Sequence, residues 1–270
     1  MASGQFKLLG ERRFSPFFFT QFLGAFNDNL FKNALVILIA FQGSSWAMTE
    51  GGMSANVLVN VAAGLFILPF FLFSATAGQI ADKYDKATLM RWIKALEIVI
   101  MAGAAVAFAL HSLALLMVLL FLMGAQSTLF GPVKYGYLPA HLDNRELTGG
   151  NGMVELGTFL AILLGTIAGG QLVHAVGDRT LVIGISVLVF AVLGWLVSLL
   201  IPRTASSAPD LELNWNPVSE TIRIVGYARE NRTIFLSIMG ISWFWAVGAM
   251  YLAQLPNYVR VDLGGDETVV

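Results

Sequence analysis

Long apolar runs alternate with short polar segments along the whole chain. Most of these runs reach about 20 residues, the length that an α-helix needs to cross a bilayer. The pattern predicts seven spans, at residues 14–41, 55–81, 89–110, 113–132, 150–173, 181–201 and 234–258. We therefore expect an all-α membrane protein.

The composition supports this interpretation. Of the 270 residues, 57% are hydrophobic and 12% are charged, whereas soluble domains carry about 25% charged residues. The net charge of −1 argues against a nucleic-acid partner, because phosphate binding needs a concentrated basic surface. There is no cysteine, and His111, His141 and His174 lie in separate segments, so we expect no metal site. Without an enzyme signature or a phosphate-binding loop, we expect no catalysis, no ATP and no cofactor.

The first span carries polar residues in its middle. They are Gln21, Asn27, Asp28, Asn29, Lys32 and Asn33. At about 100° per residue, all except Asn27 fall on one arc of a helix. Asp28 precedes Lys32 by four residues, the favoured order for an intrahelical ion pair. An uncompensated charge at this depth costs about 2.5–3.5 kcal/mol, so we expect the arc to line a water-filled substrate pathway. The alternative is polar contact between packed helices.

Two further residues join the predicted pathway, Gln126 in the fourth span and Glu155 in the fifth. A carboxylate within a span either lines a cavity or pairs with a cation. The candidate partners of Glu155 are Lys32 and Lys134, and the sequence does not choose between them. Glu155 either couples to an ion gradient or forms a structural salt bridge. The small residues at 165–170 predict close packing of helices.

The end of the fourth span has two interpretations. Gly131-Pro132 predicts a break or kink in the helix. Lys134, Tyr135 and Tyr137 would then lie at the inner membrane interface. Aromatic residues at that depth are typical interface anchors, while Lys134 beside hydroxyl groups is also a candidate site for an anionic head group.

Basic residues gather on one side of the predicted spans. They are Lys7, Arg12, Arg13, Lys83, Lys86, Arg91, Lys94, Lys134, Arg145, Arg203, Arg223, Arg229 and Arg232. Only Arg179 falls on the other side. By the positive-inside rule, the N-terminus is cytoplasmic. The first apolar run lacks a small-residue cleavage site, so we expect it to be a retained span.

The longest connection follows the sixth span. Its first part, RTASSAPDLEL, is typical of a linker, and Asn216-Pro217 predicts the start of a short amphipathic helix at the cytoplasmic interface. The predicted domains are a six-helix bundle at 1–201, a cytoplasmic linker at 202–231, and a transmembrane helix with its following loop at 232–270.

The first and fourth spans contain similar stretches of sequence. FLGAFNDNLF at residues 22–31 is similar to FLMGAQSTLF at residues 121–130. Three-helix repeats of inverted topology are a known transporter design. Chance similarity between apolar helices is the alternative.

The turn after the second span resembles the signature loop of the major facilitator superfamily, G-x-x-x-D-[RK]-x-G-[RK]. Gly78, Asp82, Lys83 and Lys86 match this motif, and Asp85 stands where the family usually has glycine. The resemblance implies that the four matching residues form a conformational latch. In such a latch the glycine allows close helix approach, and the acid–base cluster breaks as the bundle rocks. The alternative is an ordinary charged turn.

Two stretches narrow the resemblance. Residues 17–29 (FFFTQFLGAFNDN) and 130–142 (FGPVKYGYLPAHL) are similar to the lysophospholipid transporter family. This similarity implies a secondary transporter in the bacterial inner membrane that flips lysophospholipid, such as lysophosphatidylethanolamine, inward by alternating access. It also implies an acyltransferase and acyl-carrier-protein ligase, as partner or fused domain, that re-acylates the lipid.

By this resemblance the chain holds the N-terminal six-helix half of a major-facilitator-type bundle, a linker and the first helix of the second half. We expect such a truncated form to be incompetent in transport by itself. Two other interpretations stay open. The chain belongs to a proton-coupled transporter of another small solute, or it is the membrane domain of a fused phospholipid acyltransferase.

Overall fold

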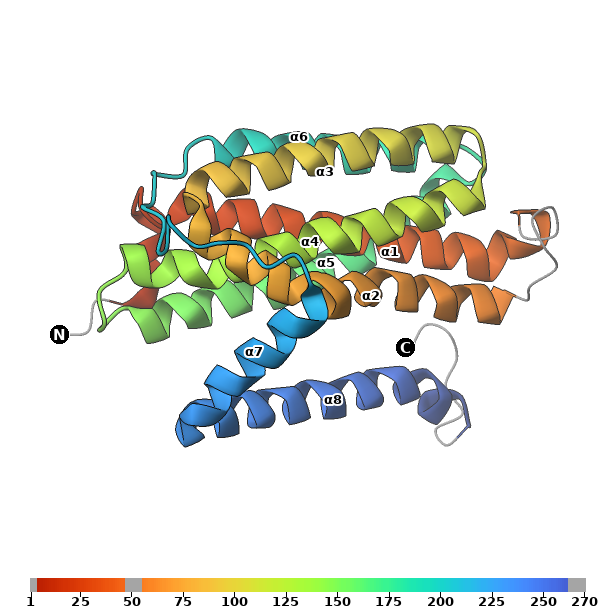
Figure 1. Cartoon of the computed structure of the whole chain (residues 1–270). Helices are drawn as coiled ribbons and strands as arrows, with labels where there is room; N and C mark the ends of the chain where they lie inside the picture. The colour runs from red at the N-terminus through yellow and green to blue at the C-terminus, as the bar shows by residue number, and fades with distance from the viewer. Residues whose placement is uncertain (1–3, 47–54, 262–270) are drawn as a thin grey trace. The chain divides into compact units, whose positions relative to one another are not determined.

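The structure, a computed structural model, describes residues 4–46 and 55–261, of which the side chains of 41–46, 55–56 and 249–261 are left out. Within these residues it contains one 3-10 helix, eight α-helices and no strand (Figure 1). The helices are η1 Gln5–Gly10, α1 Ser15–Trp46, α2 Ala55–Lys83, α3 Lys86–Ala109, α4 Leu113–His141, α5 Leu147–Val176, α6 Leu181–Ser198, α7 Pro217–Glu230 and α8 Arg232–Val261. The predicted loop at 262–270 lies outside the described residues.

Among the described residues, six helices are long and apolar enough to cross a membrane, and they are α1 to α6. This finding confirms the all-α, multi-pass membrane fold. The part of α8 whose side chains are described, Arg232–Gly248, is apolar but shorter than a span. The seventh span therefore stays a prediction.

The fourth helix differs from its predicted course. It continues through Pro132 and Pro139 to His141, so the helix does not break at Gly131-Pro132, and a kink there stays a prediction. Beyond Pro132, α4 buries Val133, Tyr137 and Leu138 completely or nearly so against the bundle. This packing stabilises a helix that has lost a backbone donor, as is common for proline within membrane spans.

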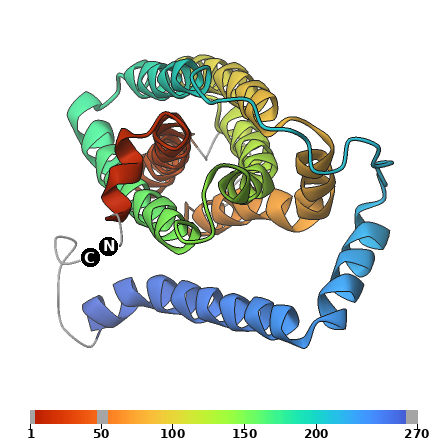
Figure 2. The ribbon, with the colours of Figure 1, turned by 90° about the vertical axis from the view of Figure 1, so that its left-hand side faces the viewer.

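The six spans pack in pairs. Viewed along the bundle (Figure 2), α1 lies beside α5, α2 beside α4, and α3 beside α6, while α1 also contacts α6 and α3 contacts α4. Exchanging α1–α3 with α4–α6 maps this set of contacts onto itself. The α1–α5 pair becomes α4–α2, and the α1–α6 pair becomes α4–α3. Two inverted three-helix repeats give this pattern, which supports an interpretation of the sequence similarity between the first and fourth spans as an internal repeat.

The interior of the bundle contains two clusters of buried apolar residues. The first, near the start of α1, is built around Phe14, Phe17 and Met90. The second, in the other half of the bundle, is built around Phe31 and Phe108, whose ring centroids are 6.0 Å apart. Between them, α1 runs through the polar segment that the sequence analysis singled out.

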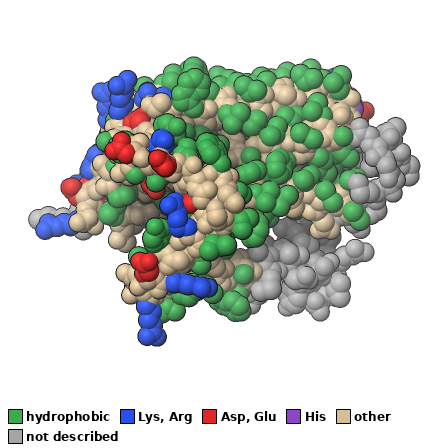
Figure 3. Space-filling model, in the orientation of Figure 1, with side chains coloured by type: hydrophobic (Ala, Val, Ile, Leu, Met, Phe, Trp, Pro, Cys, Tyr) green, Lys and Arg blue, Asp and Glu red, His purple; other side chains and the backbone are tan. Residues whose placement is uncertain are grey.

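The outer surface of the bundle is apolar. Large side chains such as Phe71, Trp92 and Val99 are exposed, as expected for helices that contact lipid. Figure 3 shows hydrophobic side chains over the middle of the molecule and charged side chains gathered toward the end at which α1 begins.

The chain divides into two compact units, residues 1–217 and 218–270. Helix α7 begins at Pro217, where the sequence predicts the start of a short helix. Its apolar residues Val218, Ile222 and Val225 are exposed, and Arg223 forms an ion pair with Glu220. Such an amphipathic helix is typical of the membrane interface.

Close packing of α5 on α1 depends on Gly165. A Cβ atom at this position would lie 2.5 Å from the carbonyl oxygen of Phe26 and 3.0 Å from the Cβ of Asn29. We expect Gly165→Ala to force the two backbones apart and to destabilise the protein by about 1–3 kcal/mol, the usual cost of overpacking. The measurement is the midpoint of thermal unfolding of the purified protein in detergent.

Gly152→Ala on the same helix is the matched control, because nothing lies within 4 Å of its Cβ position. Alanine also has the higher helix propensity, so this variant should unfold at or above the wild-type midpoint. A Gly165→Ala protein as stable as Gly152→Ala would show that the helices do not meet there.

Candidate functional site

A layer of polar side chains separates the two apolar clusters. On α1 it extends from Gln21 to Asn29, between Phe18 of the first cluster and Leu30 of the second. The other helices contribute Lys94 and Glu97 from α3, Gln126 and Ser127 from α4, and Thr158 from α5. Because apolar residues flank the layer on both sides, its polar groups must find partners within it.

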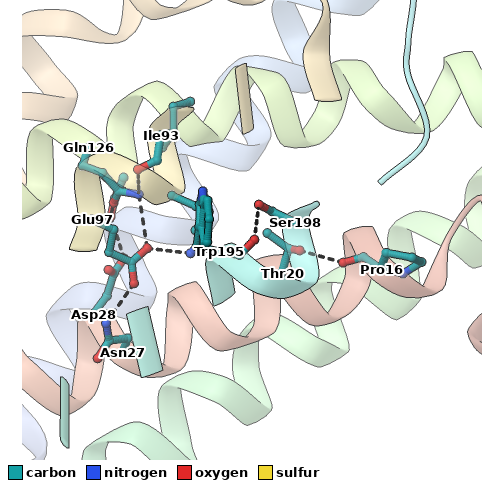
Figure 4. Close-up of polar contacts among 11 residues, drawn as sticks. Pro16, Thr20, Asn27, Asp28, Ile93, Glu97, Gln126, Trp195 and Ser198 are labelled. Atoms are coloured by element: carbon teal, nitrogen blue, oxygen red, sulfur yellow. Dashed lines mark hydrogen bonds and ion pairs between the residues drawn. The ribbon is translucent and has the colours of Figure 1, made fainter. Parts of the chain in front are cut away.

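The ion pair between Lys94 and Glu97 lies at the centre of the layer. Lys94 Nζ is 2.6 Å from Glu97 Oε2, and the two side chains are only 2% and 1% exposed. Asn27 Nδ2 donates to Glu97 Oε1 at 2.8 Å, and Gln126 Nε2 donates to Oε2 at 3.3 Å (Figure 4). One carboxylate therefore accepts hydrogen bonds from α1, α3 and α4.

Asp28 bonds to α4 and does not pair with Lys32. Ser127 Oγ donates to Asp28 Oδ2 at 2.6 Å, which connects α1 directly to α4. Lys32 Nζ donates instead to Asn29 Oδ1 at 3.0 Å and lies 5.3 Å from the ring centroid of Phe66 on α2. The predicted Asp28–Lys32 ion pair is wrong, because each side chain finds a partner in a different direction.

A cavity of about 210 Å³ opens beside this layer. It is lined by residues of α1 to α5, and Gln21, Asp28, Gln126, Lys134 and Tyr135 from the predicted sites are among them. Lys94, Ser127 and Thr158 also line it, as do the rings of Phe70 and Phe130. The walls are thus partly charged and partly aromatic.

Other predicted pathway residues do not line this cavity. Asn27 and Asn29 are 0% and 7% exposed, and Asn33 Nδ2 donates to Thr166 Oγ1 on α5 at 3.0 Å. These amides make polar contacts within and between packed helices, which was the alternative interpretation. Asn27 Oδ1 has no hydrogen-bond partner in the described part of the chain.

Glu155 pairs with Lys134, one of its two candidate partners. Glu155 Oε1 lies 3.9 Å from Lys134 Nζ and accepts a hydrogen bond from Tyr135 Oη at 2.6 Å. Lys134 Nζ also donates to Thr158 Oγ1 at 2.9 Å, and this hydroxyl donates to Gln21 Oε1 at 3.0 Å. Glu155 itself does not line the cavity, but it neutralises a lysine that does.

Tyr137, one of the predicted head-group residues, does not line the cavity in this structure. Its side chain is fully buried, and its ring stacks on Phe17 at 4.6 Å and on His141 at 3.9 Å between centroids. Its hydroxyl donates to the carbonyl oxygen of Arg13 at 2.8 Å. Tyr137 therefore joins α4 to the start of α1.

The predicted latch residues do not form an acid–base cluster in the described residues. Asp82 is exposed, and its backbone carbonyl accepts hydrogen bonds from the amides of Ser207 at 3.0 Å and Ala208 at 2.9 Å. Lys86 is buried and donates to Ser207 Oγ at 2.8 Å. Within the described residues, Lys83 forms no hydrogen bond or ion pair with either of them. Nothing described lies within 4 Å of the Cβ position of Gly78, so no close helix approach depends on this glycine there.

Asp85, which stands where the motif usually has glycine, stabilises the turn instead. Its carboxylate accepts the Thr88 amide at 2.7 Å as the N-cap of α3 and the Thr204 amide at 2.6 Å from the linker. Burial raises the pKa of Asp85, but the hydrogen bonds from Thr88 and Thr204 outweigh it and hold the pKa below its ordinary value. The linker is therefore bound to the α2–α3 turn.

Lys94 and Glu97 were missed at the level of sequence. Among the basic residues assigned to the cytoplasmic side of the spans, Lys94 is instead buried within α3. The available signal was the spacing of a lysine and a glutamate three residues apart inside an apolar span. That spacing brings the two side chains together on one side of a helix.

The buried ion pair gives a stability test. Glu97→Gln would leave the Lys94 ammonium without its carboxylate, and breaking a buried pair costs about 3–5 kcal/mol. Removing both charges is often nearly neutral, so we expect Lys94→Met/Glu97→Gln to recover much of the loss. The measurement is the thermal unfolding midpoint in detergent.

Glu155→Gln is the control for this series, because its ion pair spans 3.9 Å and its side chain is 36% exposed. It should lower the unfolding midpoint much less than Glu97→Gln does. The same midpoint for Glu97→Gln and wild type would contradict the structural role assigned to the pair.

Comparison with known proteins agrees with this architecture. A sequence model of the Major Facilitator Superfamily matches residues 17–269. The chain is 30% identical over 250 residues to the Lysophospholipid transporter LplT of Escherichia coli O6:K15:H31 (strain 536 / UPEC). It is 29% identical over 250 residues to LplT of Escherichia coli O139:H28 (strain E24377A / ETEC). Each alignment covers 90% of this chain and 57% of the relative, so the chain spans a little over half the length of these relatives. Because the superfamily model covers nearly all of its residues, this chain belongs to the Major Facilitator Superfamily.

Proposed function

We propose that the full-length protein transports lysophospholipid across the bacterial inner membrane by alternating access. The observation that carries the proposal is the small, charged cavity in the middle of an otherwise apolar bundle. The similarity to proteins named lysophospholipid transporters supports the same substrate class. The reaction is movement of an intact lipid, so it needs no catalytic residue.

The size and lining of the cavity suit a lipid head group. At about 210 Å³ it is smaller than the roughly 300–1,000 Å³ of pockets for drug-sized ligands. A whole lysophospholipid does not fit, but a polar head group does. Asp28, Gln126 and Lys134 supply polar contacts, and Phe70 and Phe130 supply an apolar edge along which an acyl chain leaves.

The charge distribution supports an orientation with the N-terminus in the cytoplasm. Lys7, Arg13 and Arg145 lie at the end of the bundle at which α1 begins. The α2–α3 turn and the linker bound to it lie at this same end. At this end, Asp85 joins the turn to the linker. Lipid delivered to this side is then available to a re-acylating partner, as the family resemblance implies.

Asp28 tests the proposed pathway. Asp28→Asn keeps the size of the side chain but removes the only carboxylate that lines the cavity within the described residues. We expect uptake of lysophosphatidylethanolamine by cells or vesicles containing the full-length variant to fall at least tenfold, because charge-assisted hydrogen bonds are the strong ones in such a site.

Asp178→Asn is the control, since Asp178 is exposed in the turn between α5 and α6. It should transport as wild type does. Unchanged uptake by Asp28→Asn would mean that the polar segment of α1 is only structural. Wild-type protein that moves another solute but no lysophospholipid would refute the proposed substrate.

A further inference from the structure

Two lysines line the cavity, and the carboxylate that pairs with each lies behind it. Lys94 and Lys134 are both lining residues, whereas Glu97 and Glu155 are not. Asp28 is the one carboxylate that lines the cavity in the described part of the chain. The charged groups on the walls are therefore two ammonium groups and one carboxylate. Because Glu97 and Glu155 lie behind the lysines, both ammonium groups can still donate hydrogen bonds to an anionic ligand group in the cavity.

The Lys94 ammonium is held in place by its surroundings. Glu97 Oε2 lies 2.6 Å from Lys94 Nζ, and the ring centroid of Phe130 lies 5.4 Å from the same nitrogen, at the cavity wall. A Cβ atom on Gly24 would overlap the ammonium, so the absence of a side chain on residue 24 leaves space for this group beside α1. An ammonium has three donors, and those not used by Glu97 are available to the cavity that the side chain lines.

The Lys134 ammonium is held by residues of α4 and α5. It donates to Thr158 Oγ1 at 2.9 Å, pairs with Glu155 at 3.9 Å and lies 5.0 Å from the ring centroid of Tyr135. Its long ion pair is weaker than the contact between Lys94 and Glu97. Lys134 can therefore turn toward an anion in the cavity at small cost.

We propose that Lys94 and Lys134 together bind the phosphodiester of the transported lipid, with Glu97 as the residue that positions Lys94. This inference rests on the proposed function and adds a defined phosphate subsite to it. A phosphodiester carries one negative charge and presents oxygen acceptors to both ammonium groups, which approach it from α3 and α4. Gln126, which also lines the cavity, supplies a neutral polar group.

Equilibrium binding to the purified full-length protein in detergent tests the subsite. The probes are lysophosphatidylethanolamine, lysophosphatidylglycerol and a monoacylglycerol, which has no phosphate. We expect Lys134→Gln and Lys94→Met/Glu97→Gln each to weaken binding of both lysophospholipids about tenfold or more, the effect of losing a charged hydrogen bond. Binding of the monoacylglycerol should stay the same. The double variant avoids leaving a buried carboxylate unpaired.

Lys7→Gln is the control, because Lys7 is an exposed lysine in η1, outside the spans. It should bind every probe as wild type does. Variants that unfold like wild type and also bind both lysophospholipids like wild type would overturn the phosphate subsite while leaving the proposed function intact. Wild-type protein that binds no lysophospholipid would overturn both.

Inorganic phosphate distinguishes the two sources of a phosphate group. We expect it to bind weakly by itself, because the acyl chain and the rest of the head group are missing. Tight binding of inorganic phosphate that is lost in both lysine variants would assign the site to the free anion and overturn its assignment to lipid.

Discussion

The buried carboxylate of Glu97 is the constraint on which the rest of the bundle depends. A charge at this depth is costly unless it is paired and its acceptor sites are filled. Here Lys94 from the same helix, Asn27 from α1 and Gln126 from α4 all donate to it. Because these donors come from three helices, α1, α3 and α4 hold a fixed register with respect to one another. Lys94 on α3, Asp28 on α1 and Gln126 on α4 all line the cavity, so this register sets the position of its walls.

The internal repeat explains why the polar groups meet. When residues 22–31 are aligned with residues 121–130, Asp28 corresponds to Ser127, and these two side chains are joined by a hydrogen bond. Asn27 corresponds to Gln126, and both donate to Glu97. A pseudo-two-fold relation between α1 and α4 brings equivalent positions together at the contact between the two helices. The polar side chains of α1 and α4 therefore meet because they occupy equivalent positions in the two halves of the bundle.

The same local bond recurs at the next pair of equivalent positions. Asn29 Nδ2 donates to the carbonyl of Ala25, and Thr128 Oγ1 donates to the carbonyl of Gly124, each four residues back along its helix. Both bonds satisfy a side chain within its own helix, so neither residue needs a partner across the bundle.

Hydrophobic length alone was enough to predict six spans, since a bilayer imposes about 20 residues on any helix that crosses it. The periodicity of α1 placed Gln21 and Asp28 together, and both line the cavity. It failed for Lys32, because an angular position on one helix does not say which neighbouring helix offers a partner. Lys94 was misassigned for a related reason. Counting charges near a loop does not reveal that Glu97, one turn further on, neutralises the lysine inside the bundle.

The substitution of Asp85 for the usual glycine shows how a turn motif is modified by its tertiary contacts. A glycine there would offer no side chain, whereas the Asp85 carboxylate caps α3 and binds the linker amide of Thr204. Gln79 adds a second connection, exchanging two hydrogen bonds with the backbone of Asn214 at 3.1 and 2.7 Å. With Lys86 bound to Ser207, the linker is joined to the α2–α3 turn at several points. The turn and linker must then move as one body in any rocking of the bundle, because separating them would leave the buried Gln79 and Lys86 without their partners.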